Sequence, residues 1–270
     1  MIRNVFIFAS FTCVVIMTWP LSIDATEQPW DPLNPSQTSR VIEIVDGDTV
    51  IIEPEVEGAR EIRLVGIQAP KIPLGRKNFK AWPKGEEAKS TLTELLLNRE
   101  VTLHFDGPRT DRYGRLLAHL KRDDGLWVQA ELLRLGLARV YSFPDNRSRV
   151  DEMLEIERLA RETSQGIWQI PFYDVRNIDE AADLIGRFEL IAGTVTDVAT
   201  TSKRFYINFG DDWRTDFTLT IEGKARRLFR DAELDPLSLK NRTIRVRGWL
   251  KAYNGPMINL THPEQIEFLD

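Results

Sequence analysis

Three short segments carry residue types that suit work on a phosphodiester. The first, Val45-Asp46-Gly47-Asp48-Thr49, places a carboxylate beside a hydroxyl on a glycine-relaxed turn, and hard cations prefer such oxygen ligands. The second runs from Arg63 to Lys71 and the third from Asp111 to Arg115, and each supplies an arginine. Two guanidinium groups that converge on one point would hold a phosphodiester and its developing negative charge.

Each motif is ordinary when it is taken alone. Asp-Gly-Asp is also a common turn, Ile-Arg-Leu a common strand and Tyr-Gly-Arg a common loop. Their order and spacing in one chain favour a functional site over three unrelated structural segments. The chain resembles the thermonuclease family, also called staphylococcal nuclease-like domains, over residues 38 to 170, including the later Gly136 to Val140 and Gly166 to Trp168.

The resemblance implies an OB-type barrel that carries a calcium-dependent nuclease site. In the family, the second Asp of the turn ligates calcium, and this position is Asp48 here. The two phosphate-binding arginines of the family fall on Arg63 and Arg115. These three residues are the main catalytic candidates. Asp46 and Thr49 support the turn and are further candidate metal ligands.

Two positions depart from the family pattern. The family has an Asp as a second calcium ligand where this chain has Gln68, and a Glu proposed to activate water where it has Lys71. An amide oxygen is a poorer calcium ligand than a carboxylate, and a charged ammonium can neither ligate a cation nor accept a proton. We therefore expect calcium affinity to be low, although a divalent cation is the cofactor that the resemblance implies.

Several interpretations of Lys71 stay open. The site could bind phosphodiesters without cutting them. Alternatively, Lys71 could supply the positive charge that calcium normally brings, while another group handles the proton. A buried lysine with a lowered pKa can also act as a base. The remaining alternative is that Lys71 is a solvated loop lysine. We keep Lys71 among the catalytic candidates, at a position where the residue differs from that of the family.

Four further residues are candidates for contact with the substrate. The whole chain has a net charge of −5, so strong binding to nucleic acid would need local basic patches. The loop after Pro70 is basic and contributes Lys77 and Lys80. The rings of Tyr113 and Tyr141 could stack on bases. Solubility is the alternative role for the lysines, and core packing is the alternative for the tyrosines.

The first half of the chain is predicted to form the scaffold of this site. Alternating and β-branched stretches predict strands, and apolar residues at helical spacing predict helices. Five strands with packed helices indicate the OB-type barrel, in a mainly β fold with helices (α+β). The predicted strands cover residues 41–44, 49–53, 61–65, 100–105 and 116–121, and the predicted helices cover residues 86–97, 128–135 and 150–163.

A second, smaller OB-like barrel is predicted after the first. Residues 171–187 read as a linker with a short helix at 179–185. Strands are then predicted at 188–198, 204–209, 217–221, 243–252 and 257–260, with a helix at 224–230 after the third strand. Aromatic residues on such a sheet can stack bases beside arginines, with core packing as the alternative. The candidates are Tyr206, Phe209, Trp213, Trp249 and Tyr253, with Arg204, Arg245 and Arg247 nearby.

The beginning of the chain has the pattern of an export signal. Arg3 precedes an apolar run from Val5 to Trp19, which is short for a membrane span of about 20 residues, and a cleavage site follows near Ala25. An uncleaved N-terminal anchor is the alternative. The only cysteine, Cys13, lies inside this run, so the chain after cleavage would contain no disulfide or thiolate-metal site.

The predicted organisation combines these segments. Residues 1–25 form the signal peptide, 26–38 a proline-rich tether, 39–170 the thermonuclease-like domain, 171–187 the linker and 188–270 the OB-like domain. The function predicted is an exported, endonuclease-like phosphodiesterase that acts on DNA or RNA through an altered catalytic and metal site. We expect it in the periplasm, outside the cell or anchored in the envelope. The alternative is a non-catalytic envelope module that binds nucleic acid or protein.

Overall fold

The computed structural model describes residues 37 to 270. The predicted export signal, including Cys13, and nearly all of the predicted tether lie outside the described residues. Within the described part of the chain, no helix combines the length and the apolar character needed to cross a membrane.

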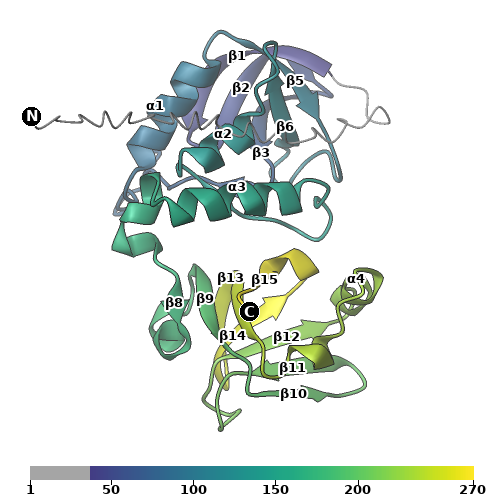
Figure 1. The fold of residues 1–270 in the computed structure, drawn as a ribbon. Coiled ribbons are helices and arrows are strands. Elements are labelled where there is room, and N and C mark those ends of the chain that lie inside the picture. Colours follow the sequence, from purple (N-terminus) through teal and green to yellow (C-terminus); the bar gives the residue numbers. More distant parts are fainter. Residues whose placement is uncertain (1–36) are drawn as a thin grey trace, which may run out of the picture. The chain divides into compact units, whose positions relative to one another are not determined.

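Five strands in the first half of the described chain close into a barrel (Figure 1). Around the barrel the order is β1-β2-β3-β6-β5, and β5 pairs again with β1. All neighbours are antiparallel except β3 and β6, which are parallel. The predicted OB-type barrel is therefore confirmed. The strands are β1 (Gln37–Asp46), β2 (Thr49–Val56), β3 (Ala59–Leu64), β5 (Glu100–His104) and β6 (Leu116–Arg122).

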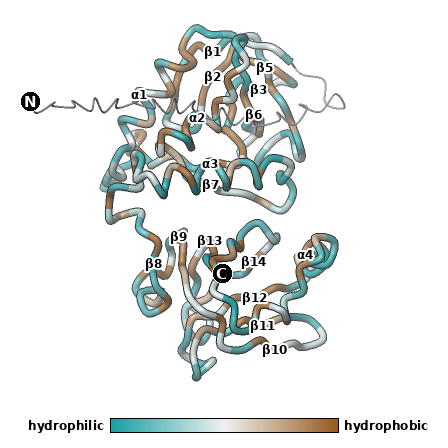
Figure 2. The backbone as a smooth tube through the Cα atoms, in the orientation of Figure 1, coloured by the Kyte–Doolittle hydropathy of each residue, from teal (hydrophilic) through white to brown (hydrophobic). Residues whose placement is uncertain are grey.

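Alternating apolar side chains fill the barrel and direct polar ones outward. In β3, Ile62 and Leu64 are fully buried, whereas Arg63 between them points to the opposite side of the strand. In β6, Leu116 and Ala118 are buried in the same way. Hydrophobic colouring accordingly follows the strands, while the connecting loops are mostly hydrophilic (Figure 2). This alternation fixes the side of β3 from which Arg63 emerges.

Helices and two short strands pack with the barrel, and together they form what we call the first unit. In α1 (Gly85–Leu96), residues spaced by four positions, such as Ala88, Leu92 and Leu96, form a buried stripe. The helices α2 (Val128–Arg134) and α3 (Val150–Glu162) pack on each other, close to their predicted bounds. Two short strands, β4 (Ile67–Gln68) and β7 (Arg139–Val140), pair antiparallel.

A second, curled sheet follows a connector of short helical turns (Figure 1). Its order is β10-β11-β12-β14-β13-β9-β8, with β15 also paired to β13, and β12 and β14 run parallel. The connector contains η1 (Gly166–Gln169), η2 (Pro171–Tyr173), β8 (Arg176–Asn177) and η3 (Ile178–Leu184). The remaining elements are β9 (Phe188–Thr194), β10 (Asp197–Thr200), β11 (Arg204–Asn208), β12 (Thr218–Glu222), α4 (Ala225–Asp231), η4 (Pro236–Leu239), β13 (Thr243–Tyr253), β14 (Gly255–Leu260), η5 (Pro263–Gln265) and β15 (Ile266–Phe268).

One strand prediction for the second sheet was wrong. Residues 188–198 were predicted as a single strand, but they contain the whole of β9 and the start of β10. The break lies where the hydrogen-bond partner changes. The amide of Val195 donates to the carbonyl of Arg242, and the amide of Thr196 donates to that of Asn208. The chain therefore leaves β13 and joins β11 at this point.

The second sheet has its own apolar core, and one of the predicted base-stacking residues belongs to it. Ile207, Leu219, Ile221 and Phe229 are fully or almost fully buried in this core. Phe209 belongs to it as well and packs against the Phe217 ring at 5.1 Å between centroids. Phe209 therefore fills the core, which is the core-packing interpretation of this residue.

Candidate nucleic-acid site

One cavity gathers four of the predicted site residues. It is lined by the stretch from Arg63 to Ile67, by the loop before β6 with Tyr113 and Arg115, and by Tyr141 at the end of β7. Three segments that are distant in the sequence therefore meet at one place. Lys77 and Lys80 are exposed on the loop between β4 and α1 and do not line this cavity.

Asp48 lies fully buried beside this cavity, at the turn between β1 and β2. Its carboxylate accepts hydrogen bonds from the Ala69 amide at 2.8 Å and from Lys71 Nζ, at 3.1 Å to one oxygen and 2.9 Å to the other. The Arg63 guanidinium forms an ion pair with it at 3.1 Å. The negative charge of Asp48 is therefore balanced by two cations, Arg63 and Lys71.

The neighbours of Asp48 keep the turn in place. Asp46 Oδ1 accepts the Asp48 amide at 3.1 Å, and Thr49 Oγ1 donates to Asp48 Oδ1 at 3.3 Å. Burial acts to raise the pKa of Asp48, but the charges of Arg63 and Lys71 outweigh it and lower that pKa to about 2. Burial and the nearby Asp48 charge raise the pKa of Asp46. Asp48 therefore stays ionised at neutral pH.

The Arg63 side chain is largely occupied by the protein itself. It donates to the carbonyl oxygens of Asp48, Leu64 and Ile67 at 3.2, 2.7 and 2.7 Å, and only 12% of its side chain is exposed. A guanidinium with this many fixed acceptors shapes the turn before it meets a ligand. Its main contribution at the cavity wall is a fixed positive charge.

Gln68 has a partner that was not predicted. Its side-chain oxygen accepts from Arg139 Nε at 3.1 Å and from Arg139 Nη2 at 2.8 Å, because β4 and β7 place the two residues opposite each other. Arg139 also lies 4.7 Å from the centre of the Phe188 ring. Burial lowers the pKa of Arg139 to about 10, so it remains charged at neutral pH.

These contacts do not fit a calcium ion at Asp48. Calcium takes about six to eight oxygen ligands. Here the ammonium of Lys71 touches both carboxylate oxygens of Asp48, and the Gln68 oxygen already accepts from Arg139. Between residues 37 and 270, no three His, Cys, Asp or Glu side chains cluster as metal ligands. The surroundings of Asp48 suit an ammonium group instead.

Arg115 is the more accessible of the two arginines. It forms a two-point contact with Asp111, at 2.8 Å from Nε and 2.7 Å from Nη2, and about a quarter of its side chain is exposed. The Tyr113 ring, 68% exposed, lies 5.5 Å from its guanidinium carbon. Partial burial acts to raise the pKa of Asp111, but hydrogen bonds from Arg115 lower it overall. Arg115 and Tyr113 therefore offer a charge and an open ring side by side.

The chain was compared with known proteins. Residues 61–170 match the family model for staphylococcal nuclease homologues. A thermonuclease of Staphylococcus intermedius is 30% identical over 126 residues, which cover 47% of this chain and 73% of that protein. The chain belongs to the staphylococcal nuclease family. Two other relatives are endonuclease YncB of Bacillus subtilis, 35% identical over 46% of this chain and 58% of its own, and the uncharacterized protein MJ1439 of Methanocaldococcus jannaschii, 35% identical over 48% and 70%.

Within this nuclease-family chain, the second sheet makes contacts with the first unit that the sequence did not indicate. Arg247 on β13 is almost fully buried and pairs with Glu157 of α3 at 2.8 Å and with Glu267 of β15 at 2.5 Å. Arg245 pairs with Glu267 at 3.0 Å. Both arginines are therefore engaged in ion pairs with carboxylates of the protein itself. The sequence carried no signal for these pairs, because Arg247 and Glu157 are 90 positions apart.

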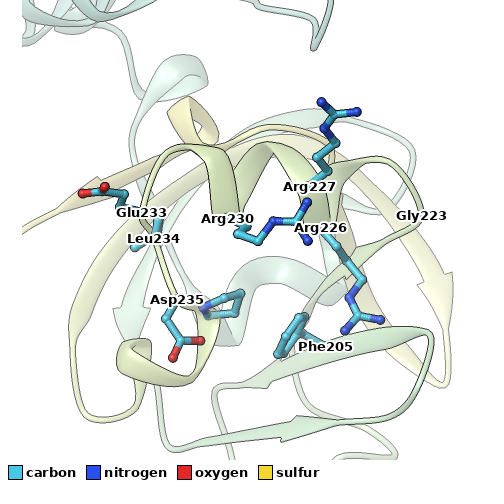
Figure 3. Close-up of a pocket in the computed structure, with 9 residues that line it drawn as sticks. Phe205, Gly223, Arg226, Arg227, Arg230, Glu233, Leu234 and Asp235 are labelled. Atoms are coloured by element: carbon cyan, nitrogen blue, oxygen red, sulfur yellow. The ribbon is translucent and has the colours of Figure 1, made fainter.

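Two other cavities lie on the second sheet, apart from the nuclease-family site. One is lined by three arginines of α4 and by Phe205 (Figure 3). Each of these arginines has a protein partner: Arg226 donates to the Ser202 carbonyl, while Arg227 and Arg230 pair with Asp231. The other cavity is lined by three of the predicted aromatic candidates, Tyr206, Trp213 and Tyr253. Arg204 lies 5.6 Å from the first of these rings and forms an ion pair with Glu222.

Proposed function

We propose that this protein binds a single strand of nucleic acid at the Arg115 cavity and hydrolyses its phosphodiester bonds. The observation that carries the proposal is the convergence of Arg63, Arg115, Tyr113 and Tyr141 on one cavity. Guanidinium groups suit phosphate oxygens, and open tyrosine rings suit bases. Relatives that are named as thermonuclease and endonuclease support the reaction class.

The chemistry would be in-line attack of water on phosphorus. The water oxygen forms a bond to phosphorus and the bond to the leaving oxygen breaks. The proton of the attacking water passes to solvent, and the leaving oxygen takes a proton from solvent. Arg115, whose side chain is about a quarter exposed, would pair with phosphate oxygens and stabilise their developing charge. Lys71 would place a positive charge beside the Asp48 carboxylate, and Arg63 would hold the turn that carries Asp48. No step in this proposal passes through a metal ion.

A second candidate function is binding without cleavage. The observation that favours it is the state of Asp48, whose two oxygens are both occupied by Lys71 Nζ. An ionised carboxylate in such contacts cannot take a proton from water at neutral pH, since its pKa is about 2. In this case the cavity would retain a strand and release it intact.

One experiment separates the two candidates. The full chain is incubated with single-stranded DNA, RNA and plasmid, each with calcium, magnesium or a chelator, while binding is measured in parallel. We expect binding in all three conditions and cleavage that the chelator does not abolish. Binding without any cleavage would assign the second function. Arg115→Ala should weaken both processes, and Arg230→Ala, in the separate arginine-lined cavity, should change neither.

We also propose that the protein is exported. The support is the pattern of Arg3 followed by the apolar run from Val5 to Trp19. Fractionation of the native cells tests this proposal. We expect the chain in the envelope or the medium, and finding the full-length chain in the cytoplasm would contradict export.

A further inference from the structure

A tryptophan of the second sheet contacts the wall of the Arg115 cavity. Trp249 on β13 donates from Nε1 to the Tyr141 hydroxyl at 2.9 Å. Tyr141 lines the cavity, whereas Trp249 lies just beyond its lining residues. The Trp249 residue is 45% exposed. Its N–H group is thus engaged by the protein, while part of its ring faces solvent.

Trp249 ends a row of four aromatic rings that begins inside the cavity. The row runs from Phe143 to Tyr141, Phe188 and Trp249, with centroid separations of 5.0, 4.8 and 6.3 Å. All three contacts are edge-to-face, which is a favourable arrangement for aromatic pairs. Phe143, at 48%, and Trp249 are exposed, whereas Phe188 is buried. The row therefore has open rings at both ends and a buried anchor between them.

The second sheet also holds the chain on either side of Tyr141. Before it, Arg247 Nη1 donates to the Val140 carbonyl at 3.2 Å. After it, Ser142 Oγ lies 2.7 Å from His262 Nε2. Because both neighbours of Tyr141 are fixed by this sheet, the position of Trp249 relative to the cavity is well defined.

The same face of β13 carries a charge suited to a strand backbone. Arg247, Trp249 and Lys251 alternate along β13 and so point to one side of the strand. Arg247 is buried against α3 and β7, so this side of β13 faces the end of β7 that precedes Tyr141. Lys251 lies beyond Trp249 and is exposed. An open ring followed by an exposed ammonium matches a base followed by its phosphate.

We infer that Trp249 is a stacking platform for a nucleobase next to the one held at the Arg115 cavity. This inference rests on the proposed function and extends the binding surface onto the second sheet. The ligand class is a single-stranded oligonucleotide of at least two residues. A mononucleotide, which occupies only the cavity, would not reach the Trp249 ring.

The test compares Trp249→Ala with a matched control in the full chain. Trp213→Ala removes another exposed tryptophan, which lies in the loop between β11 and β12 and lines a different cavity. We expect Trp249→Ala to weaken binding of a short single-stranded oligonucleotide about 5- to 100-fold, the usual range for one stacked base. Its affinity for a nucleoside monophosphate should stay within about twofold, and Trp213→Ala should change neither affinity.

A conservative variant separates stacking from positioning. Trp249→Phe keeps an aromatic ring but loses the donor to Tyr141, so it should retain most of the oligonucleotide affinity. Oligonucleotide binding should also quench tryptophan fluorescence in the wild type and in Trp213→Ala, and much less in Trp249→Ala. Circular dichroism melting confirms that each variant is folded.

The outcomes separate the stacking role of Trp249 from the proposed function. If Trp249→Ala leaves oligonucleotide affinity unchanged while Arg115→Ala weakens it, the inference is wrong and the proposed function stands. If Trp249→Ala weakens mononucleotide and oligonucleotide equally, Trp249 only positions Tyr141 and the stacking role is wrong. If Arg115→Ala changes no binding at all, the proposed function fails, and the inference fails with it.

Discussion

The two β units share a strand order but use their charges differently. In the barrel, β1 pairs with both β2 and β5, and β3 runs parallel to β6. In the second sheet, the pair β9 and β10 takes the place of β1, and β12 runs parallel to β14. Among residues 37 to 270, the turn after the first barrel strand holds the buried, ion-paired carboxylate of Asp48, whereas the corresponding turn after β10, residues 201–203, has no carboxylate. The same strand order therefore carries different side chains at corresponding turns.

The difference lies in where the ionic groups sit. The carboxylate of Asp48 in the barrel is fully buried beside an arginine and a lysine. In the second sheet, a comparable pair, Asp197 with Lys240, is more than half exposed on both sides. The most buried ion pairs of the second sheet instead involve Arg247 and reach the first unit. The buried ion pairs of the second sheet therefore join it to α3 of the first unit.

The largest expected effect concerns the junction between the units. Arg247→Met leaves the buried Glu157 without one of its partners, so we expect a loss of about 3 to 5 kcal/mol in the free energy of unfolding. Arg204→Met breaks a partly exposed pair with Glu222 and should cost less than about 1 kcal/mol. Urea unfolding measures both. Equal losses would mean that the junction is no stronger than a surface contact.

The next effect tests the ammonium beside Asp48. Lys71→Met removes one of two cations from a fully buried carboxylate and should cost about 1 to 3 kcal/mol, because Arg63 remains. The pKa of Asp48, now about 2, should rise, which a carbon-13 NMR titration can follow. The matched variant Lys240→Met should cost less than about 0.5 kcal/mol. An unchanged pKa of Asp48 would contradict the contact with Lys71.

A binding comparison sets the two arginine-lined cavities against each other. Arg115→Ala should weaken oligonucleotide binding about 10- to 100-fold, because hydrogen bonds between charged groups are worth about 1.5 to 3 kcal/mol. Arg230→Ala should change binding less than about twofold, since Arg230 lines the cavity on α4. Fluorescence anisotropy at two salt concentrations is the measurement, and a larger effect of Arg230→Ala would move the binding site to the second sheet.

A pH dependence of stability is expected in both units. Burial lowers the pKa of His119 in the barrel and of His262 in the second sheet to about 4. The unfolded chain binds these protons near pH 6.5, so stability should fall as the pH drops from about 6.5 to about 4. We expect each histidine to account for up to about 3 kcal/mol of that loss at pH 4. Histidine-to-glutamine variants should each flatten the profile, and an unaltered profile would contradict the assignment.

The sequence predicted the barrel well because its signals are local. Alternating residues such as Ile62, Arg63 and Leu64 reveal the strand and the side from which the arginine emerges. The helix bounds at α1 and α3 were likewise close, since their apolar residues repeat at helical spacing. The break between β9 and β10 was missed, because it depends on which neighbouring strands accept the hydrogen bonds of Val195 and Thr196.

The site was predictable only in part. The motif order identified Asp48, Arg63 and Arg115, but no local pattern tells that Lys71 reaches back over 23 positions to Asp48. The pairing of Gln68 with Arg139 depends on two strands of only two residues each. Such contacts follow from the closed barrel and become visible only with the structure.

Calcium titration tests the central claim that an ammonium has replaced a metal at this nuclease-family site. Calcium is titrated calorimetrically into the wild type and into Gln68→Asp with Lys71→Glu, which restores two carboxylates beside Asp48. We predict no saturable binding to the wild type, and binding with calcium-dependent cleavage in the double variant. Saturable binding to the wild type that Asp48→Asn abolishes would contradict the claim, because the metal would then displace Lys71 from Asp48.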